Sequence, residues 1–583
     1  MDTTRRQVLM FAGGSAVGVL FTPAPWHLIT DTALWSENWP GIPAPARGEI
    51  RTRFTNCALC TAGCAVRARC VGEQPVQLSG VAGHPLSHGA MCPFGIVGHH
   101  LPYMPERLTT GAAKDAAAAV AAAIAKCGPA EHVVMLDMRP GRTASWTYRR
   151  AMASLPNGRY VAPAMDTAAA VDLTKVRTVL SFGVPVLDGW GTPGNVNAAR
   201  AGFRLIQIDA IESHTASMAD RWLRIRPGSE DLLAQALAGE ISQAAASDAT
   251  GVTVPEIASL AKELELGGPV LVLGSARIAS GPGTVVERLE TPLPAEWKKA
   301  APAADLASLP DGSVRVLFLD ESAPGEYLPW NAIAKKLVAD NPLVVAFSCT
   351  RTGYARHATY ALPAAVYLEV ADDIPPAIDS TVATFRIAAP LVSPPVGMVN
   401  PEEFVAAAAG LAIGDTLHER AGAIHQSGRG TLFTYADGKS QTLKEVSADN
   451  FWKGLNAGGC WIDDPNPKPA ASRLLTAANA PTPAEESDLP LAVVVTQELA
   501  PGSPLLSKLY QESNLRLAPG SVALNPACGL DDGAPATFET LLGKCRVAVT
   551  LDAAVPPGVV LVSGSPEVLD LYAAGARAKV VRA

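Results

Sequence analysis

Three cysteines crowd into the segment NCALCTAGC, at Cys57, Cys60 and Cys64, and a fourth, Cys92, follows after 27 intervening residues. Three thiols on one short loop can face a common point, and a fourth thiol from a distant turn can close the shell around it. Four thiolates suit either a tetrahedral zinc ion or a cubane iron–sulfur cluster. This spacing therefore predicts a segment that folds around a metal.

The unequal grouping of the cysteines separates the candidate metals. A structural zinc site usually pairs two C-x2-C knuckles, with two cysteines on each side. Here one side offers three cysteines and the other offers one, which favours a 4Fe–4S cluster; zinc and disulfides stay open as alternatives. Cys70 alternates with Val66 and Ala68, as a strand residue would, so it is expected in a core and not among the ligands.

The first residues indicate export. Arg5 and Arg6 precede an apolar run, Val8–Phe21, which is shorter than the ~20 residues of an ordinary membrane-spanning helix. Paired arginines in this position predict a twin-arginine signal over residues 1–35, cleaved or kept as an anchor. The alternative is an ordinary starting helix that carries two arginines. Export of a folded protein would suit a metal centre, because bare thiols become disulfides in an oxidising periplasm.

The middle of the chain alternates between two patterns. Its 583 residues exceed what one core can hold, at ~150 residues for a domain. Short apolar runs with few charges, typical of strands buried on both faces, alternate with helix-like segments. This alternation predicts α/β sheets over 109–480. The six runs are HVVMLDM, RTVLSFGV, FRLIQIDA, PVLVLG, VRVLFLD and PLVVAFSC.

The last part of the chain differs in character. After a linker rich in Pro and acidic residues, the runs LAVVVTQ, SVALNP, RVAVTLDAAV and GVVLVSG are separated by Gly and Pro. Short strands with such punctuation predict a β-barrel domain over 490–583. The whole chain is 48% hydrophobic with a net charge of −8, so it is expected to be globular and offers no basic field for nucleic acid.

The cysteine segment resembles the N-terminal iron–sulfur segment of the molybdopterin oxidoreductases, the dimethyl sulfoxide reductase superfamily. That family has the same cysteine spacing, then a small hairpin, then a Gly-x-x-x-His-Pro turn that Gly80, His84 and Pro85 match. The resemblance implies four domains: an N-terminal β-rich iron–sulfur domain over 36–108, two α/β sheet domains and a C-terminal dinucleotide-binding barrel. His84 is expected to serve the turn. The implied ligands of one 4Fe–4S cluster are Cys57, Cys60, Cys64 and Cys92.

Two further stretches resemble the family's binding elements for a pterin dinucleotide. In VLSFGVPVLDGWGTPGNV, glycines would let the backbone approach a pyrophosphate. In the run that begins LIQIDA, two carboxylates stand where the family recognises sugar and guanine, with Glu in place of the usual second Asp. The resemblance leaves molybdopterin guanine dinucleotide open as a second cofactor. The candidate cofactor-binding residues are Gly183, Gly189, Gly191, Asp209 and Glu230.

The chain departs from the family where the metal chemistry would be. Phe94 stands where the family usually has Lys or Arg between cluster and pterin. The region that normally supplies a metal ligand holds no Cys. We interpret Ser145 in that region as a polar residue at the start of a helix, and Asp166 as a helix cap. The chain is also shorter than most members. We therefore assign no catalytic residue and expect no working molybdenum site.

With these departures, the chain resembles the molybdopterin-binding-like subunits of the menaquinone reductase complex and of alternative complex III. That resemblance implies a membrane-associated respiratory oxidoreductase on the periplasmic face of the inner membrane, linked to quinone. Its implied partners are a ferredoxin-like iron–sulfur protein and a polytopic quinone-binding subunit, with a multihaem cytochrome c as a further candidate. The alternatives are a catalytic bis-pterin molybdenum or tungsten oxidoreductase and a non-catalytic assembly subunit.

Overall fold

A computed structural model of the chain provides the structure. It describes residues 48–163, 169–275, 277–322, 328–435, 438–464, 469–470, 488–496, 503–513, 517–572 and 577–583. The expected export signal over 1–35 and the residue Asp166 lie outside these ranges. Within them, no helix is both long enough and apolar enough to cross a membrane.

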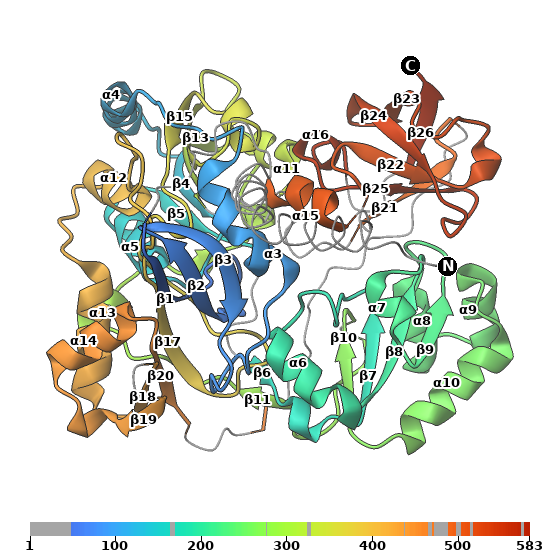
Figure 1. The fold of residues 1–583 in the computed structure, drawn as a ribbon. Coiled ribbons are helices and arrows are strands. Elements are labelled where there is room, and N and C mark those ends of the chain that lie inside the picture. The colour runs from blue at the N-terminus through green and yellow to red at the C-terminus, as the bar shows by residue number, and fades with distance from the viewer. Residues whose placement is uncertain are drawn as a thin grey trace, which may run out of the picture.

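The cysteine segment forms a small antiparallel sheet. Its strands are β1 (Ile50–Asn56), β2 (Ala65–Val71) and β3 (Gln74–Gly80), in that order. A short helix, α3 (Pro93–Val97), and a 3-10 turn, η1 (Gly98–Tyr103), follow. The sheet is drawn in blue at the centre of Figure 1, between the larger parts of the molecule.

A parallel six-stranded sheet is the largest in the structure. Alternate strand residues point to opposite faces, so Val133 and Met135 pack under three helices while Val134 and Leu136 pack on the other face. In sheet order the strands are β12 (Ala303–Ala304), β5 (Gly158–Val161), β4 (His132–Asp137), β13 (Val314–Glu321), β14 (Leu343–Ser348) and β15 (Tyr360–Pro363). The three covering helices are α4 (Ala113–Ala125), α5 (Thr143–Ser154) and α12 (Pro401–Ala408), and the other face meets α11 (Trp330–Ala334).

A second parallel sheet is inserted between strands of the first. Helices cover both of its faces, as a fully buried parallel sheet requires. In sheet order its strands are β10 (Val270–Leu273), β7 (Thr178–Phe182), β8 (Arg204–Asp209) and β9 (Arg221–Arg224). The helices of this part are α6 (Pro193–Ala199), α7 (His214–Ser217), α8 (Glu230–Leu237), α9 (Gln243–Thr250) and α10 (Val254–Leu266).

All six apolar runs singled out in the middle of the sequence are strands of these two parallel sheets. The expected mixed α/β architecture is thereby confirmed. The chain order differs from a simple series of domains, because the six-stranded sheet takes strands from both before and after the four-stranded one. The residue limits expected for the individual domains stay predictions.

A five-stranded antiparallel sheet was not expected from the sequence. It packs against two helices, α13 (Thr416–Ser427) and α14 (Ala448–Asn456). In sheet order its strands are β16 (Asp372–Asp373), β17 (Ala383–Ala388), β20 (Cys460–Asp463), β18 (Thr431–Thr434) and β19 (Lys439–Thr442). Two short strands, β6 (Ala169–Val171) and β11 (Val285–Glu287), form a separate antiparallel pair.

The C-terminal part closes into a six-stranded barrel, which confirms the barrel expected there. In order around the barrel the strands are β21 (Leu491–Val495), β25 (Val559–Val562), β22 (Ser521–Leu524), β24 (Gly543–Leu551), β23 (Pro535–Thr540) and β26 (Arg577–Arg582). Two helices belong to this part, α15 (Leu505–Ser513) and α16 (Pro566–Leu569). Leu505, Leu506 and Leu509 of α15 share a buried cluster with the cysteine segment.

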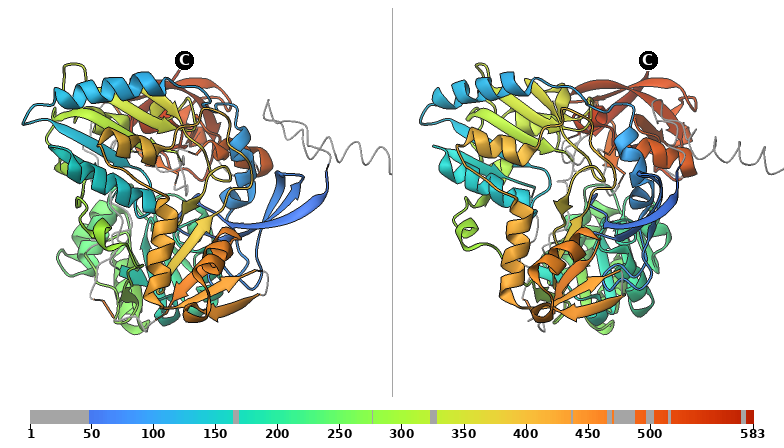
Figure 2. Two further views of the ribbon diagram at one scale, coloured as in Figure 1. Left: turned by 90° about the vertical axis from the view of Figure 1, so that its left-hand side faces the viewer. Right: turned by 60° about the vertical axis from the view of Figure 1, so that its left-hand side comes forward.

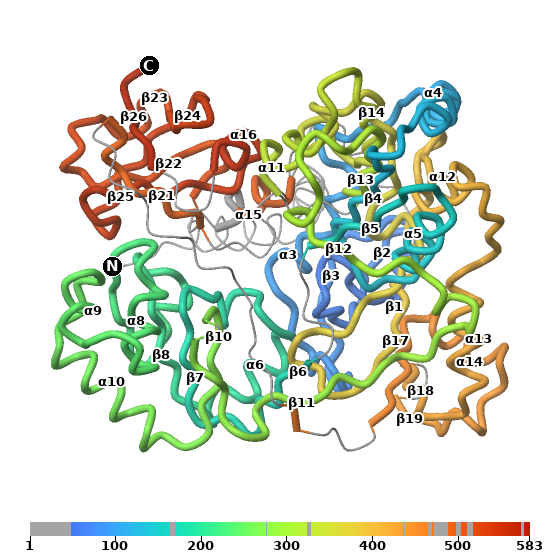
Figure 3. Tube along the Cα trace, turned by 180° about the vertical axis from the view of Figure 1, so that it is seen from behind, coloured from blue at the N-terminus to red at the C-terminus, as the bar shows by residue number. Residues whose placement is uncertain are grey.

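The parts surround the cysteine sheet. Figure 1 places the six-stranded sheet at upper left, the four-stranded sheet at lower right and the barrel above the latter, and the view from behind in Figure 3 agrees. The side views in Figure 2 show the cysteine sheet at the right-hand side of the molecule, with the helices over the six-stranded sheet on the left. The cysteine segment thus lies next to the larger parts of the molecule.

Candidate functional site

The loop between β1 and β2 carries three of the four clustered cysteines. The hairpin register pairs Asn56 with Ala65, so the loop spans 57–64. Its two ends are tied together, because the Cys57 backbone N–H donates to the Cys64 carbonyl at 2.8 Å. The local hairpin thereby brings the first and third cysteines side by side, with Cys60 at the tip.

The fourth cysteine reaches this loop from the start of α3, where Cys92 precedes Pro93. A methyl group added at Gly95 would lie 3.8 Å from Cys57 Sγ and 3.9 Å from Cys92 Sγ. The two sulfurs therefore flank the same small volume next to Gly95.

The four thiols face one another closely enough to interact. Burial raises the pKa of Cys57, and Cys60, Cys64 and Cys92 each raise it further. Burial also raises the pKa of Cys60 to about 12, with Cys92 as the next cause. Four thiolates in one buried volume repel each other unless a cation lies between them, so the arrangement suits a bound metal centre.

Backbone amides also point at the sulfurs. Burial raises the pKa of Cys92, and the N–H groups of Gly95 and Phe94 donate to its sulfur and oppose the rise. The N–H groups of Ala62 and Gly63 have the same effect on Cys60. Donation of this kind stabilises thiolates, which are the ligand form of cysteine.

A single ion and a cluster require different spacings of their ligands. In the described part of the chain, no three His, Cys, Asp or Glu side chains lie close enough to hold a single metal ion. A 4Fe–4S cluster spreads its four thiolates over different iron atoms, so its sulfurs stand farther apart than the ligands of one zinc. Cys70 is buried in β2, and the charges that act on its thiol after burial are Arg53 and Glu73.

His84 organises the turn between β3 and Cys92. Its buried Nδ1 accepts the backbone N–H groups of Leu86 at 3.2 Å and Ser87 at 3.1 Å. Burial first and then the nearby Arg386 lower the pKa of His84 to about 3, so the ring is neutral at physiological pH. It serves the turn, as the sequence interpretation expected.

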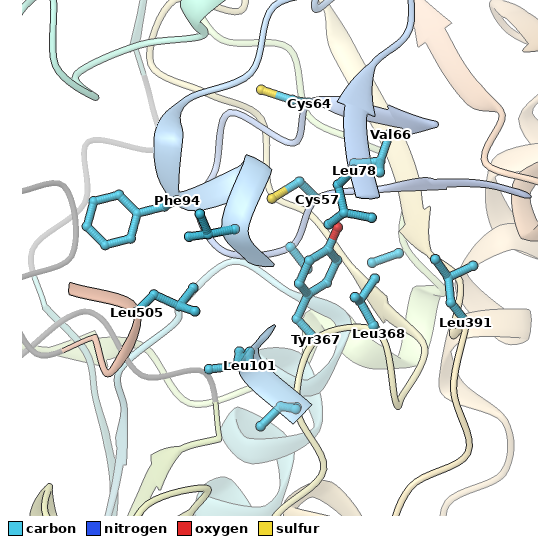
Figure 4. Close-up of a cluster of buried hydrophobic side chains, with 14 of the residues drawn as sticks. Cys57, Cys64, Val66, Leu78, Phe94, Leu101, Tyr367, Leu368, Leu391 and Leu505 are labelled. Carbon is cyan, nitrogen blue, oxygen red and sulfur yellow. The ribbon is translucent and has the colours of Figure 1, made fainter. Parts of the chain in front are cut away.

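The structure brings three side chains to the cysteine loop that sequence reasoning missed. Tyr367 places its hydroxyl beside Cys57 (Figure 4), and burial and then the Cys57 thiol raise its pKa. Arg139 donates to the Ala58 carbonyl at 2.7 Å, and Arg386 donates to the Gly63 carbonyl at 2.7 Å. No local signal reveals these contacts, because each crosses more than eighty positions of sequence.

Phe94 is buried in an apolar setting. It shares a core cluster with Val97, Leu101 and Leu505, and Figure 4 shows its ring beside Leu505 of α15. The residue that stands in the family's cationic position thus packs the barrel's helix onto the cysteine segment.

The four-stranded sheet has an edge suited to a nucleotide. The chain runs from β7 through β8 to β9 on one side, and β10 lies on the other side of β7. Ligands of open α/β sheets bind outside the carboxyl ends of the strands at such a switch point. Gly183 follows β7 with φ 68°, and its N–H donates to the Ile208 carbonyl at 2.8 Å. Asp209 ends β8 beside it.

The predicted dinucleotide residues divide into two groups. Asp209 lies near Glu230; burial raises the pKa of Glu230, and the charge of Asp209 adds to the rise. Gly189 has φ 111° in the loop that leaves Gly183. Gly191 instead packs against Asp379, because a methyl group added at Gly191 would lie 3.1 Å from the Asp379 carboxylate. Gly183, Asp209 and Glu230 thus gather at the switch point, whereas Gly191 faces another segment.

Two polar atoms near this edge lack partners. Gln207 Oε1 and Trp190 Nε1 are buried, and no described residue hydrogen-bonds either atom. An unpaired buried polar atom usually marks a missing water, ion or ligand. Burial also raises the pKa of Asp209, which accepts a hydrogen bond from the Ser213 hydroxyl at 2.8 Å. These groups fit the sugar and base of a nucleotide.

The same loop connects the two sites. Asp188, between Gly183 and Gly191, lies close enough to Cys92 to raise the pKa of that thiol after burial has done so. On the other side, the charge of Glu230 adds to burial in raising the pKa of Tyr572, in the barrel part. A ligand at the switch point would therefore lie between the cysteine segment and the barrel.

The six-stranded sheet has its own switch point, between β4 and β13, and charged side chains of the chain fill it. Asp137, the last residue of β4, pairs with Asp320, the last but one of β13. Arg142 donates to Asp320 at 2.8 Å, to Asp137 at 3.3 Å and to Asp372 at 3.0 Å. The Tyr148 hydroxyl also donates a hydrogen bond to the Asp320 carboxylate, at 2.8 Å. We call this group the charged plug.

Ser145 belongs to the charged plug as well. It lies in the first turn of α5, and its hydroxyl donates to Asp137 at 2.6 Å; Tyr160 donates to the same carboxylate oxygen at 2.8 Å. Ser145 therefore supports the plug, and its hydroxyl points at a carboxylate of the chain.

Comparison with known proteins supports the superfamily. No family model matches the chain. The menaquinone reductase molybdopterin-binding-like subunit of Nitratidesulfovibrio vulgaris is 23% identical over 482 residues, which cover 68% of this chain and 70% of that protein. A sulfite dehydrogenase subunit of Allochromatium vinosum is 25% identical over 33% of this chain and 24% of its own length.

A solved structure shows the same fold. Acetylene hydratase from Pelobacter acetylenicus superposes with a TM-score of 0.67 over 91% of this chain and 100% of its own, at 14% identity. That identity supports the fold alone. The sequence relatives and this fold support the resemblance to the molybdopterin oxidoreductase (dimethyl sulfoxide reductase) superfamily, and the sequence is similar to a molybdopterin-binding-like subunit of menaquinone reductase.

Proposed function

We propose that this protein is the iron–sulfur, molybdopterin-fold subunit of a membrane-associated respiratory oxidoreductase that faces the periplasm and exchanges electrons with quinone. One observation carries the proposal: Cys57, Cys60, Cys64 and Cys92 face one buried volume. They would hold a 4Fe–4S cluster, which takes up and passes on one electron at a time.

The proposal includes the absence of a working molybdenum site. A bis-pterin metal needs two dinucleotides, and the two parallel sheets offer two switch points. At the four-stranded sheet, Gln207 and Trp190 have unpaired buried atoms that fit a nucleotide. At the six-stranded sheet, Arg142 and its carboxylate partners occupy the corresponding edge. Within the described ranges, the residues fit one dinucleotide and do not fit two.

The alternative of a catalytic bis-pterin molybdenum or tungsten enzyme draws support from the four-stranded sheet alone. An assembly subunit without a cluster is the second alternative. Metal analysis of the purified chain separates the three: the proposal requires iron without molybdenum, the first alternative both metals, and the second neither.

Partners and location are proposed from the relative named as a menaquinone reductase subunit. The proposed partners are a ferredoxin-like iron–sulfur protein and a polytopic quinone-binding subunit, and the proposed route is twin-arginine export to the periplasmic face. Replacing Arg5 and Arg6 by Lys should keep the protein in the cytoplasm when cells are fractionated; unchanged arrival at the membrane would contradict the export route.

A further inference from the structure

A buried arginine from the five-stranded sheet touches the cysteine loop. Arg386 lies in β17 and is 2% exposed. Its Nη1 donates to the Ala62 carbonyl at 2.9 Å and to the Gly63 carbonyl at 2.7 Å. A methyl group at Gly63 would lie 2.5 Å from the guanidinium carbon, so the guanidinium occupies the place of a side chain at this glycine.

Arg386 differs from the other buried arginines in its charge balance. Among the described residues, Arg107, Arg142 and Arg420 are also buried, and each forms an ion pair with a carboxylate. Arg386 forms no ion pair with a carboxylate within the described ranges; its Nε has no hydrogen-bond partner there, as is also true of the Nε atoms of Arg107 and Arg420. An unpaired buried charge is costly, so a negative group beside it is implied.

The candidates for that negative group are the cluster ligands. The guanidinium donates to the carbonyls of Ala62 and Gly63, which lie in the loop between Cys60 and Cys64, so its charge lies beside two of the proposed ligands. It also opposes the burial that raises the pKa of Cys460. A second arginine also reaches the loop, but Arg139 is paired with Asp372 at 3.1 Å, so its charge is balanced locally.

A cluster held by four thiolates is an anion, and one added electron makes it more negative. A fixed cation in a buried, weakly polarisable setting stabilises the more negative state, because little water screens the attraction. Groups around a metal centre tune its potential in this way. Phe94 stands where the family usually has a Lys or Arg and supplies no positive charge. Arg386 can supply a positive charge beside the cluster instead.

We propose that Arg386 is the charge partner of the cluster and favours its reduced state. The inference rests on the proposed cluster. It makes Arg386 a positioning residue that both holds the loop through the carbonyls of Ala62 and Gly63 and sets how readily the cluster accepts an electron from a one-electron donor.

The test is a potentiometric titration of the purified full-length protein, followed by electron paramagnetic resonance. Arg386→Gln keeps hydrogen-bond donors but removes the charge, and should lower the equilibrium constant for reduction at least tenfold, about 59 mV for a one-electron couple. Arg386→Lys keeps the charge and should lose less than half of that. Arg315→Gln, which removes a charge paired with Glu131 on the six-stranded sheet, is the control and should leave the potential unchanged.

A loaded Arg386→Gln variant with the wild-type potential would overturn the inference. If that variant carries no iron, Arg386→Lys decides: a loaded cluster near the wild-type potential supports the role of charge, and loss of iron from both variants assigns Arg386 a purely structural part. Absence of iron and of any cluster signal in the wild-type protein would instead refute the proposed cluster itself.

Discussion

The charged plug makes a quantitative prediction. Arg142→Leu removes the guanidinium that Asp137, Asp320 and Asp372 share, and leaves these carboxylates in the fold without it. Breaking a buried ion pair from one side typically costs about 3–5 kcal/mol, because a charge stays buried without compensation. Local opening of the six-stranded sheet should then become roughly a hundred- to several-thousand-fold more frequent, at about 1.36 kcal/mol per tenfold.

The loss should depend on pH. Burial alone would raise the pKa of Asp320, but Arg142 and Ser322 hold it below the usual value. A depressed pKa contributes stability above the unfolded-state pKa of about 3.9, and this contribution disappears as the pH falls through the folded-state value. In Arg142→Leu, burial dominates and the pKa rises above the unfolded value. The variant should therefore be most destabilised at neutral pH and approach the wild type in acid.

Hydrogen exchange followed by mass spectrometry measures this prediction in β4 and β13, since a chain of several domains has no single unfolding transition. Arg315→Leu is the matched control, because it breaks a more exposed ion pair to Glu131 at the other end of the same two strands, β4 and β13. Unchanged protection of β4 and β13 in Arg142→Leu, or a loss as large at pH 4 as at pH 7, would refute the account of the plug.

Three further predictions concern the cysteines, the nucleotide edge and Phe94. Cys60→Ser should lose the cluster's absorbance and iron, whereas Cys70→Ser should keep both; equal iron in the two variants would exclude Cys60 as a ligand. Gln207→Leu should release less nucleotide than the wild type on acid precipitation. The control Gln235→Leu on α8 should release as much as the wild type, and equal amounts from all three proteins would show that Gln207 does not contact the nucleotide. Phe94→Lys should speed hydrogen exchange in α3 and η1 through a loss of about 3 kcal/mol of local stability, since it puts an ammonium beside Leu505 in an apolar cluster; unchanged exchange would contradict the packing described.

Local pattern sufficed for much of the fold. Runs such as VRVLFLD consist mainly of apolar residues, which is typical of a strand buried on both faces. The strand β13 could therefore be predicted without knowing its neighbours. The hairpin that gathers Cys57 and Cys64 is also local, because its strands adjoin in sequence. The closed barrel was predictable for the same reason, from short strands with regular turn residues.

The remainder depends on contacts between distant segments. Strand β17 pairs with β20, with some seventy positions between them, so nothing near ATFRIA marks it as part of a sheet. Asp137 and Asp320 become neighbours only through the register of β4 and β13. Arg386 reads in the sequence as one charge in an apolar stretch, and its contact with Gly63 spans 323 positions. The groups that surround the predicted cofactors were therefore beyond sequence reasoning, although most of the candidate ligands were not.

The central claim is a cluster without molybdenum, and the metal content of the purified full-length protein tests it most directly. Elemental analysis of protein isolated without oxygen should give about four iron atoms per chain and no molybdenum or tungsten. Stoichiometric molybdenum or tungsten would contradict the claim and support a bis-pterin enzyme, and absence of iron would contradict the cluster assigned to Cys57, Cys60, Cys64 and Cys92.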